Sequence, residues 1–350
     1  MNKKIILFLV LFFNFLFCSI LSAQYPDPVM NPYWEYYSTN ALSSISAGKG
    51  NTGVASSGDV SLIYLNPATL NLSKKFQVNV GYNLKSESGY TSLSQNFYSF
   101  SLAGAYRLTE NLQVGLAYQN DYSYNYSSGF IPESNYTNKL ETHSFRIPIV
   151  YNTRWIRFGM NINFMYLNAI EYDYQHLDLG ILLPEIGAVV TPIKELSFGS
   201  SFSPGFTSRP EYKPNNNPMY NNYNGFVKYP NRFKFGTEVR LLNNDLKLSL
   251  DYHYANTGSI EYLKDQSNYY IGLDYIIDEN FTFRCGYFTM FDFEDKTYQS
   301  KYSDDLYFVT LGTTYKINIY SFNLGAIGGM SGHSGERDYL LINFGVGFEF

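Results

Sequence analysis

The chain has 350 residues, a formal net charge of −5 and a mean hydropathy of −0.22, values that would suit a water-soluble protein. Its composition is unusual for that class, because 19% of the residues are aromatic and only 16% are charged. After the first residues, no lysine and arginine cluster could neutralise a row of phosphates. We therefore expect no nucleic-acid partner.

The N-terminus has the pattern of an export signal. Two lysines precede an apolar run over residues 5–21, which ends at Ala23. This predicts a signal peptide over residues 1–23. An uncleaved anchor is the alternative, since a spanning helix needs about 20 apolar residues. Lipidation of Cys18 is not expected, because Phe17 is too large to precede a lipidated cysteine.

Residues 24–73 show no regular alternation and form a separate predicted segment. Residues 48–53 match G-x-G-x-x-G, but a dinucleotide site needs a buried strand before this pattern and a helix beginning within it. Residues 42–46 make a poor strand and residues 54–59 a poor helix. We therefore expect no cofactor.

From residue 74 to residue 350, apolar or aromatic residues alternate with Gly, Ser, Asn or charged residues in strand-length runs. Residues 76–84, 246–254 and 339–350 are clear examples. This period of two places the apolar set on one face of each strand. A soluble β-sandwich also alternates, but its second face favours Lys, Glu and Thr. The small polar residues found here are typical of a barrel interior.

The connections between the predicted strands alternate in length. Short turns are expected near residues 108–111, 152–155, 191–195, 242–245, 277–280 and 316–319. Long polar loops are expected near residues 85–94, 125–140, 169–178, 205–229, 258–266, 291–304 and 331–337. This alternation predicts an up-and-down barrel of about fourteen strands with both ends at the periplasmic side.

Tyrosines are expected at the two membrane interfaces, where their rings are buried and their hydroxyls hydrated. Near the turns these are Tyr106, Tyr151 and Tyr315, and toward the loops they are Tyr118, Tyr166 and Tyr252. A barrel of about fourteen strands is too wide for side chains alone to fill. Residues 24–73 are of suitable size to plug it. The predicted fold is therefore an all-β transmembrane barrel, residues 74–350, with an N-terminal plug in its lumen.

An ordered set of residues in the plug resembles the hatch of the long-chain fatty acid transporter family of outer-membrane proteins, the FadL/TodX group. The set is a Gly-rich stretch ending in Gly-Val-Ala, an acidic residue, and Asn-Pro-Ala before the first strand. Its members here are Gly50, Gly53, Asp59, Asn66, Pro67 and Ala68.

The resemblance implies an outer-membrane barrel, surrounded by lipid, that passes a small hydrophobic molecule from outside. The molecule would rest in apolar pockets and leave sideways when the hatch shifts. Residues 205–229 depart from the family pattern, because they are rich in Asn, Tyr and Pro rather than forming an apolar helical pair. Secretion-associated members, PorV- and PorQ-like, bind protein partners and remain an alternative.

Charged residues at lumen-facing positions of the predicted strands have two possible roles. They could guide a substrate carboxylate or hold the plug by ion pairs, and we favour the second role. They are Arg157, Lys234, Glu238, Arg240, Asp251, His253 and Arg284.

Catalytic and metal sites are not expected. Ser249, Asp251 and His253 share a strand face, but their α-carbons are spaced about 7 Å apart, too far for a nucleophile and a base to meet. The four histidines are scattered and show no metal-ligand spacing. Pro148 and Pro184 lie inside predicted strands and predict a kink or bulge, one of which could mark a lateral opening.

Overall fold

The computed structural model describes residues 43–88, 95–127, 137–171, 175–208, 211–214, 227–256, 264–291, 305–331 and 338–350. The signal peptide predicted over residues 1–23 and the first part of the predicted plug, residues 24–42, lie outside the described residues. In the described part of the chain, no helix is long and apolar enough to cross a membrane.

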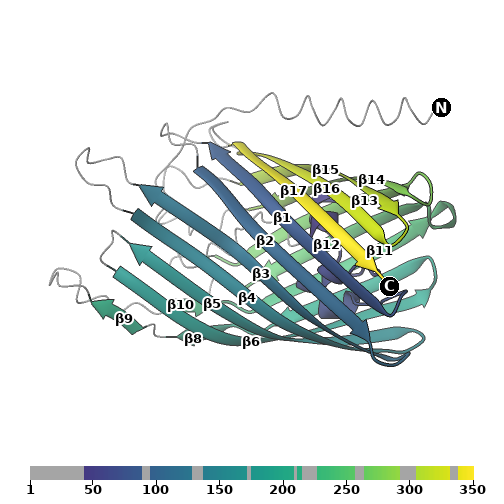
Figure 1. Ribbon diagram of the computed structural model, residues 1–350, viewed down its shortest axis with the longest axis horizontal. Helices are drawn as coiled ribbons and strands as arrows, with labels where there is room; N and C mark the ends of the chain where they lie inside the picture. Colours follow the sequence, from purple (N-terminus) through teal and green to yellow (C-terminus); the bar gives the residue numbers. More distant parts are fainter. Residues whose placement is uncertain are drawn as a thin grey trace.

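Long antiparallel strands dominate the described residues (Figure 1). The first half of the wall contains β1 (Phe76–Ser88), β2 (Gln95–Arg107), β3 (Leu112–Ser127), β4 (Thr137–Asn152), β5 (Ile156–Glu171), β6 (Gln175–Ile193) and β7 (Leu196–Ser203). The second half contains β11 (Arg232–Leu241), β12 (Leu246–Ala255), β13 (Gln266–Ile276), β14 (Phe281–Met290), β15 (Leu306–Ile317), β16 (Tyr320–Ser331) and β17 (Asp338–Glu349). Three short strands lie between the halves: β8 (Phe206–Ser208), β9 (Glu211–Pro214) and β10 (Val227–Tyr229).

Among the described residues, β1–β7 and β11–β17 form a closed antiparallel barrel of fourteen strands. The barrel closes where β1 pairs with β17. At the start of this seam Phe76 N donates to Phe350 O at 3.1 Å, and Phe350 N donates to Phe76 O at 2.9 Å. The two strand ends therefore lie together, which confirms the predicted closed up-and-down topology.

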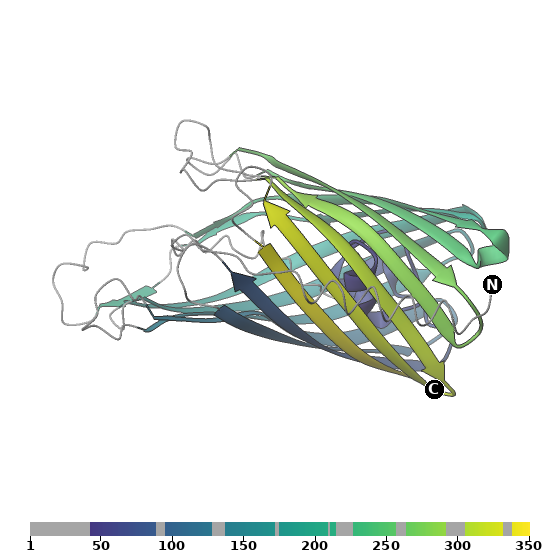
Figure 2. The same cartoon turned by 90° about the horizontal axis from the view of Figure 1, so that it is seen from above.

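Six short connections lie at one end of the barrel, which we call the turn end (Figures 1 and 2). They span residues 108–111, 153–155, 194–195, 242–245, 277–280 and 318–319, and η5 (Leu242–Asn244) lies in the fourth. Asn318 has a φ of 54°, a left-handed conformation that asparagine tolerates better than most residues. All six turns were predicted from the sequence.

The strands extend further toward the opposite end, the loop end, than the sequence predicted. Residues 125–140 and 169–178 were expected to be loops, but β3 continues to Ser127, β4 begins at Thr137, and β5 and β6 leave only residues 172–174 between them. Most of the predicted loop at residues 205–229 lies outside the described residues, apart from its short strands β8, β9 and β10.

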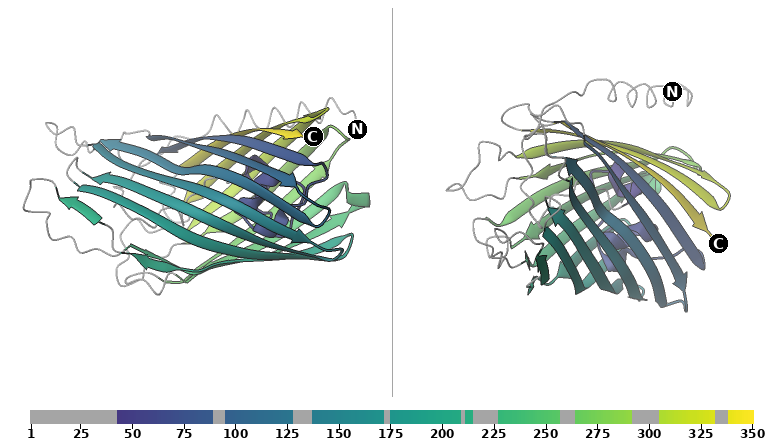
Figure 3. Two further views of the ribbon diagram at one scale, coloured as in Figure 1. Left: turned by 60° about the horizontal axis from the view of Figure 1, so that its bottom comes forward. Right: turned by 60° about the vertical axis from the view of Figure 1, so that its left-hand side comes forward.

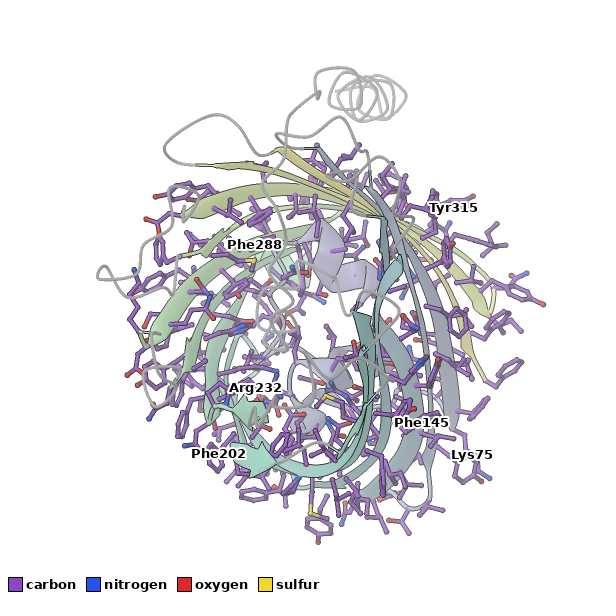
Figure 4. The ribbon with its side chains drawn as sticks, turned by 90° about the vertical axis from the view of Figure 1, so that its left-hand side faces the viewer. Lys75, Phe145, Phe202, Arg232, Phe288 and Tyr315 are labelled. Carbon is purple, nitrogen blue, oxygen red and sulfur yellow. The ribbon has the colours of Figure 1, made fainter. Side chains whose placement is uncertain are left out.

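The two faces of the wall differ as the alternation predicted. On β1, Tyr82 and Leu84 are 41% and 46% exposed, whereas Asn79 and Asn83 are buried. In the view along the barrel, Tyr315 and Lys75 lie on the outside of the wall (Figure 4). Exposed outward-facing side chains on other strands include Phe100, Leu116, Phe145, Phe164, Phe235, Ile271, Phe322 and Phe344. An apolar exterior on a closed barrel is the surface that contacts lipid in a transmembrane barrel.

Residues 43–73, which we call the hatch, fold inside the barrel as three short helices (Figures 2 and 3). They are α2 (Ser44–Gly48), η2 (Val60–Tyr64) and η3 (Pro67–Thr69). The side chains of Ser43, Asp59 and Asn66 cap them by accepting backbone N–H groups. Proline follows Asn66 at a position that needs no N–H donor. The Asn-Pro-Ala triplet is thus a local signal that starts a helix.

Candidate functional site

Asn66 joins the hatch to the barrel wall at β6. Its Nδ2 donates to Val54 O within the hatch at 2.7 Å and to Ala188 O on β6 at 3.2 Å. The Asn66 side chain lies against Gly187, where any Cβ would overlap its amide oxygen. Glycine is therefore required at position 187 for this contact.

The two glycines of the predicted hatch motif, Gly50 and Gly53, have φ values of 67° and 149°, which residues with a side chain rarely adopt. Gly50 N donates to Thr310 Oγ1 on β15 at 2.7 Å. On β14, a Cβ added to Gly286 would lie 2.6 Å from Gly50 Cα. The hatch backbone therefore touches the wall directly at this point.

Such backbone contacts recur around the barrel. At many lumen-facing glycines of the wall, an added Cβ would meet hatch atoms at less than ordinary contact distance. These glycines are Gly159, Gly187, Gly199, Gly236, Gly272, Gly286, Gly312, Gly325 and Gly345. Together they form a belt that seats the hatch.

Asp251 on β12 holds the hatch through its backbone. Its Oδ2 accepts hydrogen bonds from Gly53 N at 2.7 Å and from Val54 N at 3.0 Å. The side chain is only 5% exposed. Hydrogen bonds to a charged acceptor are stronger than neutral ones, so this carboxylate is a main attachment point for the hatch.

Lys49 is the centre of a buried ionic cluster between the hatch and the wall. It is 2% exposed, and its Nζ lies 3.2 Å from Asp274 Oδ2 and 3.1 Å from Ser56 Oγ. Asp274 also pairs with Arg284 at 2.7 Å. Ser56 Oγ donates to Glu238 Oε2 at 2.5 Å. Removing one partner of such a cluster would leave an uncompensated buried charge.

Glu185 on β6 is the centre of a second cluster. Arg146 Nη1 and Lys234 Nζ lie 3.6 Å and 3.5 Å from its carboxylate. Lys234 Nζ also donates to Leu65 O at 3.0 Å, and the Arg146 guanidinium lies 5.1 Å from the centre of the Tyr64 ring. Both cations therefore contact the carboxylate and the hatch at once.

Four of the seven predicted lumen charges contact the hatch directly. Lys234, Glu238 and Asp251 do so as described, and Arg157 Nε donates to Ala68 O at 3.1 Å. Arg240 pairs with Glu238 at 2.8 Å. Figure 4 looks along the barrel, with the hatch helices inside the wall.

Four charged residues of these clusters were missed from the sequence: Lys49, Arg146, Glu185 and Asp274. A signal for two of them was present. Glu185 is the one charged residue in the run 181–190, and Asp274 stands between two apolar neighbours. A single charge in an apolar strand indicates a buried partner, because an isolated buried charge is very costly.

Toward the loop end, buried apolar residues of β13–β17 form a cluster beyond the hatch. We call this cluster the aromatic wall, and it consists of Tyr270, Phe288, Met290, Leu306, Phe308, Ile327 and Leu341. The Phe288 and Phe308 rings stack with centroids 4.5 Å apart, and Tyr270 stacks on Phe288 at 5.5 Å. Phe288 lies on the inner side of the wall (Figure 4). His253 extends the stack, with its ring 4.1 Å from that of Tyr270.

The three residues Ser249, Asp251 and His253 are not joined to one another by any hydrogen bond in the described chain. Asp251 accepts from the hatch, whereas His253 stacks on Tyr270. Asp251 thus positions the hatch, and His253 extends the aromatic stack.

The two prolines differ in what surrounds them. Pro148 pairs with Asn161 on β5. On the β3 side, positions 147 and 148 of β4 have no ladder partner, but the register of the two strands is the same before and after them. Pro184 lies in a longer interruption. Pairing of β6 with β7 stops at Ile186, and β6 pairs again, with β9, from Asp178. Residues 179–185 therefore have no strand partner on that side among the described residues.

These features define a transmembrane β-barrel whose lumen is closed by an N-terminal plug. Comparison of the sequence with protein-family models and with curated proteins gives no match. Comparison with solved structures does.

A FadL homologue from Pseudomonas aeruginosa, 11% identical, matches 88% of this chain and 98% of its own, with a TM-score of 0.71. The monoaromatic hydrocarbon channel CymD, 11% identical, matches 89% and 98% with a TM-score of 0.68. The Pseudomonas putida toluene transporter TodX, 12% identical, matches 87% and 96% with a TM-score of 0.62. The resemblance to the FadL/TodX group is thereby confirmed at the level of the fold.

Proposed function

We propose that this chain carries small hydrophobic compounds across the bacterial outer membrane, with the hatch as the gate of the barrel. The observation that carries the proposal is the aromatic wall. A barrel that conducts water and ions has a polar lumen, whereas stacked rings line this lumen immediately beyond the hatch. Binding sites for hydrophobic ligands are lined in this way.

The contacts of the hatch support a gating role. Its attachment depends on backbone hydrogen bonds to Asp251 and on the two ionic clusters around Lys49 and Glu185. Breaking a buried ion pair has a large energetic cost, so we expect the hatch to be either fully attached or displaced, with few states between. A compound that displaced the hatch from these partners would open the lumen.

For the exit we favour the interrupted β6–β7 ladder at Pro184 over Pro148. Ile181 and Leu183 face the lumen there, and Leu182, between them, is 57% exposed on the outer face. Apolar side chains thus line both faces where strand pairing is missing. A compound leaving at this point would pass from the lumen to the bilayer without crossing water.

The proposed transport is tested by uptake of toluene and 1-decanol in a strain that lacks the gene and carries it back on a plasmid. We expect saturable uptake to return with the gene. Phe288→Ala together with Phe308→Ala should reduce it about tenfold, because two buried aromatic contacts are lost. Phe344→Ala, on the lipid-facing side, is the control. Equal uptake with and without the gene would refute the proposal.

The proposed exit is tested by attaching a bulky maleimide to single cysteines in a Cys285→Ser background. Label at Leu182→Cys should slow transfer into the bilayer several-fold, because it obstructs the interrupted ladder. Label at Leu116→Cys, which follows Gly115, the β3 residue opposite Pro148, and label at Phe344→Cys should have no effect. Slowing by the label on residue 116 alone would move the exit to Pro148.

A secretion or scaffold role is the second candidate. Short strands β8 and β10 pair with each other outside the barrel sheet, in the Tyr- and Asn-rich segment 205–229. An ordered feature there would suit contact with a protein. The uptake assay separates the two roles, since a scaffold leaves uptake of both compounds unchanged.

A further inference from the structure

The lumen wall beyond the hatch has two chemically different sides. Opposite the aromatic wall, three uncharged polar residues project inward from adjacent strands: Gln119 on β3, Thr142 on β4 and Asn163 on β5. We call them the amide wall. In the closed barrel of fourteen strands, β3 lies seven strands from β13, and β4 lies seven strands from β14. The two walls therefore face each other across the lumen.

Both walls lie next to the hatch, on its loop-end side. Asn161 donates to the hatch carbonyl of Ile63 at 3.1 Å, and Asn163 is the next inward-facing residue toward the loop end. Across the barrel, Gly286 touches the hatch and Phe288 is the next inward-facing residue. A molecule resting on the hatch would therefore meet both walls.

The amide wall is buried without internal partners. Gln119 is 1% exposed, and neither its Nε2 nor its Oε1 has a hydrogen-bond partner in the described residues. The same holds for Thr142 Oγ1 and Asn163 Oδ1, in side chains that are 3% and 5% exposed. An unpaired buried polar group destabilises the folded protein, because nothing replaces the hydrogen bonds that it made to water. Native proteins retain such groups where they have a partner or a function.

The two cations nearest the amide wall are already paired with a carboxylate and with hatch carbonyls, and on Arg146 the Nε atom lacks a partner in the described residues. The register partner of Asn163 on β4 is Arg146. Its guanidinium already pairs with Glu185 at 3.6 Å and donates to Tyr64 O at 3.3 Å. Lys234 is engaged by the same two residues. The groups that remain unpaired on Gln119 are one amide donor and one amide acceptor, which match an uncharged polar group.

We propose that the transported compound is a neutral amphiphile: an apolar body that lies against the aromatic wall and an uncharged amide or hydroxyl that binds the amide wall. This inference rests on the proposed transport function and names its substrate class. The compound would be oriented across the lumen, with its polar group toward Gln119. A carboxylate would lose hydration there beside two cations that already share Glu185.

The test uses the full-length protein in lipid nanodiscs and three ligands with one body: 4-butylbenzamide, butylbenzene and 4-butylbenzoate. Empty nanodiscs correct for partitioning into lipid. We expect the amide to bind about tenfold more tightly than the other two, the value of one to two neutral hydrogen bonds. Gln119→Leu should abolish this preference, so that the amide binds no more tightly than butylbenzene.

Gln119→Leu is expected to fold, because it replaces an unpaired buried polar group by an apolar one of similar size. Asn323→Leu is the matched control, since Asn323 is a buried lumen amide on the turn side of the hatch whose Nδ2 also lacks a partner in the described chain. It should keep the preference. Preference for butylbenzene or for the benzoate, or an amide preference that survives Gln119→Leu, would overturn the inference and leave transport standing. Binding of none of the three would overturn both.

Discussion

Replacing Gly286 with valine is expected to make the barrel leak ions. A Cβ at this position would lie 2.5 Å from Lys49 C and 2.6 Å from Gly50 Cα, so it would meet hatch backbone that has no flexible side chain to move aside. Overpacking of this kind costs about 1–3 kcal/mol. If the hatch opens to relieve it, the open fraction rises about 5- to 150-fold.

Single-channel recording in planar bilayers measures the leak. Gly286→Ala should give a smaller increase, and Gly180→Val is the matched control, because a Cβ at Gly180 meets no atom within 4 Å. Heat-modifiable electrophoretic mobility verifies that each variant forms a folded barrel. If the Gly286→Val barrel is folded and conducts no more ions than the wild type, the glycine belt does not hold the hatch closed.

Asp251→Ala is expected to loosen the hatch without a steric clash. The substitution removes the acceptor of two charge-assisted hydrogen bonds, from Gly53 N and Val54 N. Their loss should cost about 3 kcal/mol, which corresponds to roughly a hundredfold increase in opening of this segment. Amide hydrogen exchange at residues 53 and 54 should accelerate by that factor.

A matched carboxylate exists at the turn end. Asp278 Oδ1 accepts hydrogen bonds from Asn280 N and Phe281 N, both at 2.9 Å, so Asp278→Ala removes the same kind of contact far from the hatch. It should leave exchange in the hatch unchanged. Equal acceleration in both variants would mean that Asp251 stabilises the barrel as a whole rather than holding the hatch.

The barrel itself was predictable because its signals are local. A strand such as β12 alternates Leu246, Leu248 and Leu250 with Lys247, Ser249 and Asp251, and lipid on one side requires this pattern. The turns are equally local, since a left-handed residue such as Asn318 ends a strand within two residues. These two signals were sufficient for the strand number and the topology.

The loop end was less predictable for a physical reason. The ends of β3 and β4 pair over Ser123–Glu141 and Asn125–Lys139, where residues 137–141 of β4 include only one apolar residue, Leu140. If strands continue beyond the bilayer, no lipid face imposes alternation on them. The pairing persists through backbone hydrogen bonds, which the sequence does not display.

The aromatic wall was missed because alternation fails where both faces are apolar. Residues 287–290 are Tyr287, Phe288, Thr289 and Met290, so the inward-facing and outward-facing positions cannot be told apart in the sequence. The partners of Lys49 were missed for another reason. Lys49 and Asp274 are separated by 225 positions, and only the closed barrel brings them together.

That separation has a consequence for how the molecule is made. The hatch leaves the ribosome before any strand, yet several of the groups that hold it belong to β12, β13 and β14, which are synthesised late. Contacts so distant in sequence form slowly, because long chain segments must be ordered first. The early segment therefore lacks these wall contacts until the late strands are present, and pairing of β1 with β17 encloses it, so we expect closure of the wall and seating of the hatch to occur together.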